Sequence, residues 1–343
     1  MGLLGSSTTP LILQDARVPA DNLLGEIGKG HKIAFNTLNY GRLKLGAMCS
    51  GGARVAIDEA VRYASERRQF GKPIASFGAV AQKLGRMIVR QYALEAMLYR
   101  AAGLIEGAIG TDHSPARVLA ALEEFAIESS IVKVAGSEAA DFIFDENVQI
   151  HGGNGFVRDY PAERHYRDGR VNRIFEGTNE INRLIIPTLA LRRAPKIGVP
   201  LAGGSSSGAE GTAHETGADS ATVRAMKGTA RAVLGLAVER FGGRVGDEQE
   251  VLAAAADIMI EVFASESAML RARAAASELH ASAAQAYIAD ASARVQHSAR
   301  TALAAMDAAD PAPEQLMPIP LVDAVALRRQ LATAAVERRA YPL

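Results

Sequence analysis

The segment VNRIFEGTNEINRL, residues 171–184, places one carboxylate, Glu176, between an aromatic residue and a glycine. A carboxylate becomes a useful base toward a carbon acid when a dry pocket raises its pKa toward neutrality. Phe175 would exclude water from such a pocket, and Gly177 would let a ligand carbonyl come close to the backbone. The same carboxylate could instead complement the positive end of a helix capped by Thr178, a contribution of ~0.3–1 kcal/mol. This segment alone leaves both interpretations open.

Two arginines, an aromatic residue and a glycine stand together in ERRQFGKPI, residues 66–74. Guanidinium groups bind phosphate oxygens in pairs, and an aromatic ring packs on a flat heterocycle, so this stretch could hold a diphosphate ligand. The simpler interpretation is a helix C-terminus, where cations complement the helix dipole. Taken alone, the stretch favours the helix end.

A glycine cluster occurs in QIHGGNGF, residues 149–156. Gly152, Gly153 and Gly155 would allow the backbone to approach a ligand and to present free N–H groups. The cluster is equally typical of a helix end. We assign His151 no role in proton transfer, because a histidine beside such a cluster is more often packed or on the surface.

A charged residue interrupts the apolar segment LNYGRLKLGA, residues 38–47. Arg42 could contact the polar head group of a ligand near the start of a long helix. Arg42 could instead be a solvated or ion-paired arginine, and the segment by itself favours that explanation.

Long segments with helical spacing of apolar residues must position these motifs. We expect four helices with short connections, which form an antiparallel four-helix bundle. They cover residues 31–66, 77–108 and 116–150 and a last segment that begins near Thr178. Ser114 and Pro115 form the N-cap and first-turn pair of the third helix. Before the bundle, residues 9–20 have the pattern of a single β-strand, which needs a partner edge to be stable.

The second half of the chain is predicted to be helical as well. Residues 195–221 are rich in Gly, Ser and Ala and indicate a flexible linker. Further helices are expected at about 222–241, 247–276, 279–308 and 320–338. We therefore divide the chain into residues 1–28, a bundle at 29–194, the linker 195–221 and a second helical domain at 222–343.

Composition excludes several classes of protein. Lys and Arg number 38, as do Asp and Glu, so the chain of 343 residues has a net charge of zero and no basic field for nucleic acid. The lone Cys49 excludes an internal disulfide, and no His/Cys cluster has metal-ligand spacing, so a reducing cytoplasm is expected. No apolar run reaches the ~18–20 residues of a membrane-spanning helix. The neutral linker makes membrane association doubtful, and a peripheral place at the inner membrane is the alternative location.

Five motifs in order resemble the C-terminal half of the acyl-CoA dehydrogenases. They are LNxGR, ERxQFGKPI, FGAVAQKLGRM, QIHGGNGF and RIFEGTNEI. The resemblance runs from residue 1 to about Leu191 and is greatest to the very-long-chain type, which also has glycine at the position of Gly78 and an additional helical domain. It implies a mostly α fold: one residual β-strand from the central β-domain, the four-helix bundle, and a second helical domain.

The resemblance also implies a reaction. In this family FAD takes a hydride from the β-carbon of an acyl-CoA while a glutamate removes the α-proton, which gives the trans-2-enoyl-CoA of fatty acid β-oxidation. The motif FEGT places that glutamate at Glu176. The backbone N–H of the same residue and a ribityl hydroxyl of the flavin are expected to polarise the thioester carbonyl.

Binding residues follow from the same motifs. Expected FAD contacts are Arg67, Gln69, Phe70, Gln149, Ile150, His151, Gly152, Gly153, Thr178, Asn179 and Glu180. Expected acyl-CoA contacts are Asn39, Tyr40, Gly41, Arg42, Phe175 and Gly177. In the family some FAD contacts serve the neighbouring subunit, so a homodimer or larger oligomer is implied.

The family's N-terminal helical domain and most of its β-domain have no counterpart in this sequence. Two interpretations follow: the chain is one half of a split enzyme with an N-terminal partner chain, or it is a truncated, non-catalytic helical scaffold that does not hold FAD by itself. For the enzyme, electron-transfer flavoprotein is the implied electron acceptor.

Overall fold

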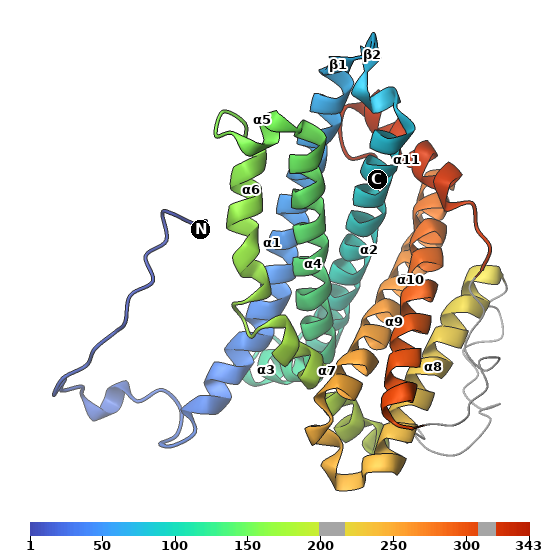
Figure 1. The fold of residues 1–343 in the computed structure, drawn as a ribbon. Coiled ribbons are helices and arrows are strands. Elements are labelled where there is room, and N and C mark those ends of the chain that lie inside the picture. The colour runs from blue at the N-terminus through green and yellow to red at the C-terminus, as the bar shows by residue number, and fades with distance from the viewer. Residues whose placement is uncertain (199–216, 308–319) are drawn as a thin grey trace.

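The computed structural model describes residues 1–198, 217–307 and 320–343, which are mainly helical (Figure 1). Three long helices run side by side, up, down and up, and the chain then returns along a shorter helix to a fifth. They are α1 (Gly30–Glu66), α2 (Gly78–Ile109), α4 (Ala126–His151), α6 (Ala162–Gly169) and α7 (Asn179–Arg193). The predicted mostly helical fold is confirmed. The helix expected to begin near Thr178 is α7, and the shorter α6 precedes it.

Small residues allow α1 and α4 to pack closely. A Cβ atom added to Gly136 of α4 would lie 3.2 Å from the Cα atom of Gly46 in α1, which is tighter than ordinary van der Waals contact. A side chain on Gly46 would in turn overlap the Val132 side chain. Close backbone approach therefore fixes α4 against α1, and through them the loops at both ends of the bundle.

The predicted third helix is interrupted. It consists of α3 (Pro115–Glu124) and α4, separated by Phe125 with φ −101° and ψ 29°. Its predicted start is confirmed, because the Ser114 hydroxyl accepts a hydrogen bond from the Arg117 amide at 3.3 Å and Pro115 occupies the first turn. Its end is also as expected, at Gly152 with φ +58°. The short helix α5 (Gly153–Phe156) follows.

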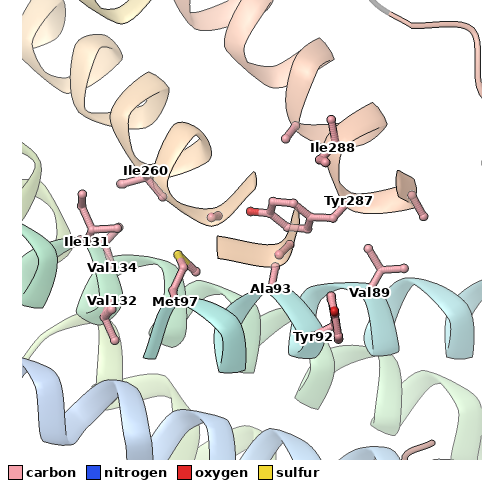
Figure 2. Packing of buried hydrophobic residues seen from close by; sticks show 14 of the residues in the cluster. Val89, Tyr92, Ala93, Met97, Ile131, Val132, Val134, Ile260, Tyr287 and Ile288 are labelled. Carbon is pink, nitrogen blue, oxygen red and sulfur yellow. The ribbon is translucent and has the colours of Figure 1, made fainter. Parts of the chain in front are cut away.

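The helices of the second half pack directly on the bundle. They are α8 (Ala218–Phe241), α9 (Gln249–Ala275), α10 (Glu278–Ala305) and α11 (Ala324–Arg338). Figure 2 shows one apolar layer in which Ile260 of α9 and Tyr287 of α10 face Ala93 and Met97 of α2. The two halves therefore share a continuous core.

Polar contacts cross the same boundary. The buried Glu95 of α2 accepts hydrogen bonds from Arg271 of α9 at 2.8 Å and from the Tyr341 hydroxyl near the C-terminus at 3.2 Å. A Cβ atom on Gly85 of α2 would lie 2.5 Å from the carbonyl oxygen of Arg328 in α11. The last helix is thus seated on α2 by backbone approach as well as by side chains.

The strand expected at residues 9–20 is not present. This segment is exposed and forms neither helix nor strand up to the 3-10 turn Ala20–Asn22, because no described strand offers its backbone an edge. The strands of the described residues are β1 (Arg68–Gln69) and β2 (Lys72–Pro73), which pair in a hairpin. The predicted residual β-strand is therefore wrong for this structure.

The linker prediction is partly corrected. Residues 195–197 belong to the 3-10 helix Ala194–Ile197, and residues 218–221 begin α8; residues 199–216 lie outside the described part. The last helix begins at Ala324 instead of residue 320, because the Asp323 side chain caps it by accepting from the Ala326 amide at 2.9 Å. None of the described helices combines the length and the apolar character needed to cross a membrane.

Candidate active site

Glu176 lies in a tight loop between the 3-10 helix Arg170–Arg173 and α7. Its φ angle is +60°, and that of Gly177 is +81°. A left-handed conformation costs a residue with a side chain ~1–2 kcal/mol relative to glycine, so surrounding contacts must hold Glu176 there.

Three side chains donate hydrogen bonds to the carbonyl oxygens of this loop. Arg42 Nε donates to Glu176 at 3.3 Å, Asn182 Nδ2 donates to Gly177 at 2.8 Å, and Lys133 Nζ donates to Gly177 at 2.7 Å. Arg42 is itself held by Asn39, whose side-chain oxygen accepts from Nη1 at 3.0 Å. These donors come from α1, α4 and α7, so the packing of three helices determines the conformation at Glu176.

The Glu176 carboxylate occupies the space where Gly41 has no side chain. A Cβ atom added at Gly41 would overlap both carboxylate oxygens. The carboxylate is half-buried, and Phe175 beside it is 37% exposed. Burial lowers the pKa of the Arg42 guanidinium, and the neighbouring charge of Glu176 opposes that shift. Four residues predicted as substrate contacts, Gly41, Arg42, Phe175 and Gly177, are thus gathered around the predicted base, whereas Tyr40 is 50% exposed and has its cation partner in Lys44.

Two residues of this site were not predicted from the sequence, Lys133 and Asn182. Lys133 is fully buried, and burial lowers its pKa to about 8. Its Nζ also donates to Asn179 Oδ1 at 2.6 Å. The available signal was a lysine within the apolar run IVKVAG, on a helix whose other side chains of that face are buried. A buried cation beside the loop stabilises the loop's carbonyl groups.

The N-terminus of α7 adjoins the Glu176 loop. Thr178 is its N-cap, as predicted, and its hydroxyl accepts from the Ile181 amide at 3.3 Å. A hydrogen bond from its own backbone amide, with a further one from Thr178, lowers the pKa of the exposed Glu180. Asn179 is buried, and its side chain donates to Ser137 and Glu138, both at 3.0 Å. Its side chain therefore supports the fold, and only its backbone lies at the helix end.

The second group of predicted residues lies on the β1–β2 hairpin. Arg67, Gln69 and Phe70 are exposed, and the Phe70 side chain is 91% exposed. Phe70 and Gly71 form the two-residue turn with φ of +50° and +81°, the signs of a type I′ turn. The hairpin thus presents an aromatic ring and an arginine to whatever binds at this end of the bundle.

Residues 149–153 lie near the hairpin, at the end of α4. Ile150 and His151 are buried, and His151 stacks on Tyr63 at 4.1 Å and donates from Nδ1 to the Asn147 carbonyl at 2.8 Å. Burial lowers the pKa of His151. Gln149, Gly152 and Gly153 are exposed, and a Cβ atom on either glycine would meet nothing within 4 Å. A ligand here would meet open backbone at the glycines and would meet Ile150 and His151 through their backbone only.

The two groups of predicted residues lie at opposite ends of the bundle (Figure 1). Arg42 and Arg67 are separated by 25 residues of helix α1, or about 37 Å along its axis. One chain therefore does not bring the hairpin residues and Glu176 together around a single small molecule.

Two family profiles match the chain. Both are described as the C-terminal domain of acyl-CoA dehydrogenase, and they cover residues 28–189 and 225–319. A probable acyl-CoA dehydrogenase of Bacillus subtilis is 47% identical over 79% of this chain and 48% of its own length. The human mitochondrial very long-chain specific acyl-CoA dehydrogenase is 42% identical over 54% of this chain and 26% of its own length.

The fold agrees with these relatives. The crystal structure of an acyl-CoA dehydrogenase complexed with FAD from Bacillus anthracis superimposes with a TM-score of 0.87 at 37% identity, over 97% of this chain and 61% of that one. The fold is that of the helical C-terminal region of an FAD-binding dehydrogenase. The chain belongs to the acyl-CoA dehydrogenase family. It spans about half the length of the Bacillus subtilis relative.

Proposed function

We propose that this chain takes part in the FAD-dependent α,β-dehydrogenation of long-chain acyl-CoA to trans-2-enoyl-CoA in fatty acid β-oxidation, with Glu176 as the base that removes the α-proton. The observation that carries the proposal is the placement of the Glu176 carboxylate in the space left by Gly41. A merely capping carboxylate needs neither a left-handed backbone nor three buried donors beneath its carbonyl groups.

The residues present fit FAD as a cofactor shared between two chains. Arg67, Gln69 and Phe70 are exposed on the hairpin, and the open glycine backbone at Gly152 and Gly153 would admit a pyrophosphate. FAD, when bound, supplies the acceptor for the hydride from the β-carbon. Because the hairpin lies about 37 Å along α1 from Arg42, a homodimer or larger oligomer would bring the hairpin of one chain to the Glu176 end of another.

The chain's own residues account for the proton transfer. A carboxylate oxygen of Glu176 takes the α-proton, and its electron pair moves toward the thioester carbonyl. The backbone N–H of Glu176 is the expected donor to that carbonyl. The Phe175 side chain, 37% exposed in the chain alone, would limit the access of water once substrate covers it. Arg42 lies close enough to Glu176 for the two charges to interact, and it keeps the loop carbonyl fixed.

Partners and location belong to the same proposal. Acyl-CoA is the proposed substrate, electron-transfer flavoprotein the proposed electron acceptor, and an N-terminal chain a proposed partner. We also propose a cytoplasmic location, which the free, buried thiol of Cys49 supports.

The test is the flavin spectrum of the chain purified alone and purified with any N-terminal partner encoded beside it. We expect bound flavin in at least the second preparation, and bleaching of its absorbance by long-chain acyl-CoA in preference to short-chain acyl-CoA. Flavin in neither preparation would contradict the proposal and would support the non-catalytic scaffold. Equal bleaching by short chains would remove the long-chain assignment alone.

A further inference from the structure

A polar pocket lies between α2, α10 and α11, away from the Glu176 loop. Its volume is about 540 Å³, within the range of small-molecule sites. Four arginines line it: Arg86 and Arg90 from α2, Arg294 from α10 and Arg328 from α11. The mechanism proposed above uses none of them.

Two of the four arginines are neutralised. Arg294 donates to Glu261 from both Nε and Nη2, the latter at 2.9 Å. Arg328 Nη2 donates to Asp290, with Nη2 2.7 Å from Oδ2. Tyr287 of α10, which lies above Ala93 of α2 in Figure 2, donates its hydroxyl proton to the same Glu261 at 2.9 Å. These contacts hold the walls of the pocket in place.

The other two arginines are not neutralised to the same degree. Within residues 1–198, 217–307 and 320–343, no carboxylate oxygen comes within 4.0 Å of the Arg90 guanidinium, which lies over the Phe142 ring at 4.0 Å. Arg86 lies over the same ring at 4.9 Å, and its Nη1 is 3.9 Å from Glu146, a carboxylate that Lys83 already holds. One ring thus orients two guanidinium groups that are paired with carboxylates less closely than Arg294 and Arg328 are.

Donor capacity in the pocket exceeds its acceptors. Burial lowers the pKa of Arg90; the charges of Arg294 and Arg86 lower it further, and the charge of Glu261 opposes them. Arg328 Nε is buried and has no hydrogen-bond partner among the described atoms. Guanidinium groups in a fixed arrangement match the oxygens of a phosphate.

We propose that this pocket binds a small dianionic oxyanion, inorganic phosphate or the phosphate group of a monoester. The two rings near the arginines, Phe142 and Tyr287, are covered by guanidinium groups. The lining holds four guanidinium groups and one ring, that of Tyr287, so the oxyanion itself is the recognised group. The proposal does not depend on FAD, acyl-CoA or activity.

The test measures phosphate affinity by isothermal titration of the purified chain, at constant ionic strength with chloride as the balancing anion. We expect saturable binding of one phosphate per chain. Arg90→Gln should weaken it at least about tenfold, the loss of one charge-assisted pair of hydrogen bonds. Arg117→Gln, which removes an exposed arginine on α3, should leave the affinity unchanged.

A second variant keeps the test decisive if Arg90→Gln does not fold. Arg86→Gln replaces a side chain that is 44% exposed and should weaken phosphate binding in the same direction. AMP should bind with an affinity similar to that of inorganic phosphate, because only its phosphate group is recognised. Equal affinity in wild type and both pocket variants, binding of AMP alone, or no heat beyond that of chloride would each overturn the proposal.

Discussion

At the scale of single residues, the site depends on what Gly41 lacks. Its missing side chain leaves room for the Glu176 carboxylate, and Arg42, Asn182 and Lys133 hold the loop that carries it. The sequence motifs predicted Glu176 and Gly41 but not Lys133. Lys133 lies 43 residues before Glu176, and only the packing of α4 on the loop brings it to the Gly177 carbonyl.

Replacing Gly41 by alanine tests this arrangement. The added methyl group should displace the flexible end of Glu176 and reduce kcat about 100-fold, since misplacement by about 1 Å can cost that much. The fold should remain, because alanine in a helix interior is favoured over glycine by ~0.5–1 kcal/mol. Gly51→Ala is the matched control on α1, where the Cβ atom meets nothing within 4 Å. Dehydrogenase activity and thermal unfolding, measured side by side, check the result; equal activity in both variants would contradict it.

Lys133 makes a prediction about pH. Its pKa is lowered from 10.5 to about 8 in the folded chain, mainly by burial. Between these pH values Lys133 carries a proton in the unfolded chain but not in the folded chain. Its contribution to the free energy of unfolding therefore increases as the pH rises. Relative to Lys133→Met, the wild type should therefore gain up to about 3 kcal/mol between pH 8 and pH 10.5.

Urea unfolding at pH 7.5 and pH 10 measures that difference. The control is Lys44→Met, which removes an exposed lysine from α1. If the Lys133→Met difference changes with pH no more than the Lys44→Met difference does, the buried lysine does not titrate in this window.

At the scale of elements, apolar periodicity predicted the helices well and their interruptions poorly. The Phe125 break between α3 and α4 has no proline or glycine to signal it. The strand expected at residues 9–20 failed for a different reason: a strand pattern indicates suitability for a sheet, and the described residues offer that segment no edge. Local sequence cannot supply the missing partner.

The close packing of α1 and α4 gives an element-scale prediction. Gly136→Ala would place a Cβ atom 3.2 Å from Gly46 and from a Leu94 methyl group, so the helices must separate. We expect the free energy of unfolding to fall by ~1–3 kcal/mol. Gly107→Ala on the exposed side of α2, where nothing lies within 4 Å, should instead be neutral or stabilising. Urea unfolding of both variants is the measurement, and equal midpoints would refute the packing argument.

At the scale of the whole molecule, the two groups of proposed site residues, which we call half-sites, lie at opposite ends of one bundle. The hairpin with Phe70 and the Glu176 loop are about 37 Å apart along α1. Residues of α1, α2, α9 and α10 belong to one continuous core, so the two ends of α1 are parts of a single folded unit. The helix length already implied this spacing, but the sequence does not show which ends would meet in the proposed oligomer.

Mixed oligomers test whether the half-sites of different chains cooperate. Glu176→Gln inactivates one half-site, and Arg67→Ala with Phe70→Ala inactivates the other. In a mixed dimer, one composite site has both defects and the other has none. Unfolded together and refolded in equal amounts, the two inactive variants should recover roughly a quarter of wild-type activity, because half of the dimers are mixed and each has one intact site. No recovery in a preparation that contains mixed dimers would show that the two half-sites of different chains do not form a shared active site.

The most direct test of the account is the exchange of the α-hydrogen of an acyl-CoA with deuterated solvent, in the flavin-loaded protein. Removal of that hydrogen is the step assigned to Glu176, so Glu176→Gln should slow the exchange ~10²–10⁴-fold. Glu106→Gln, which removes an exposed carboxylate from α2, should leave it nearly unchanged. Exchange at the wild-type rate in Glu176→Gln would contradict the assignment of Glu176 as the base.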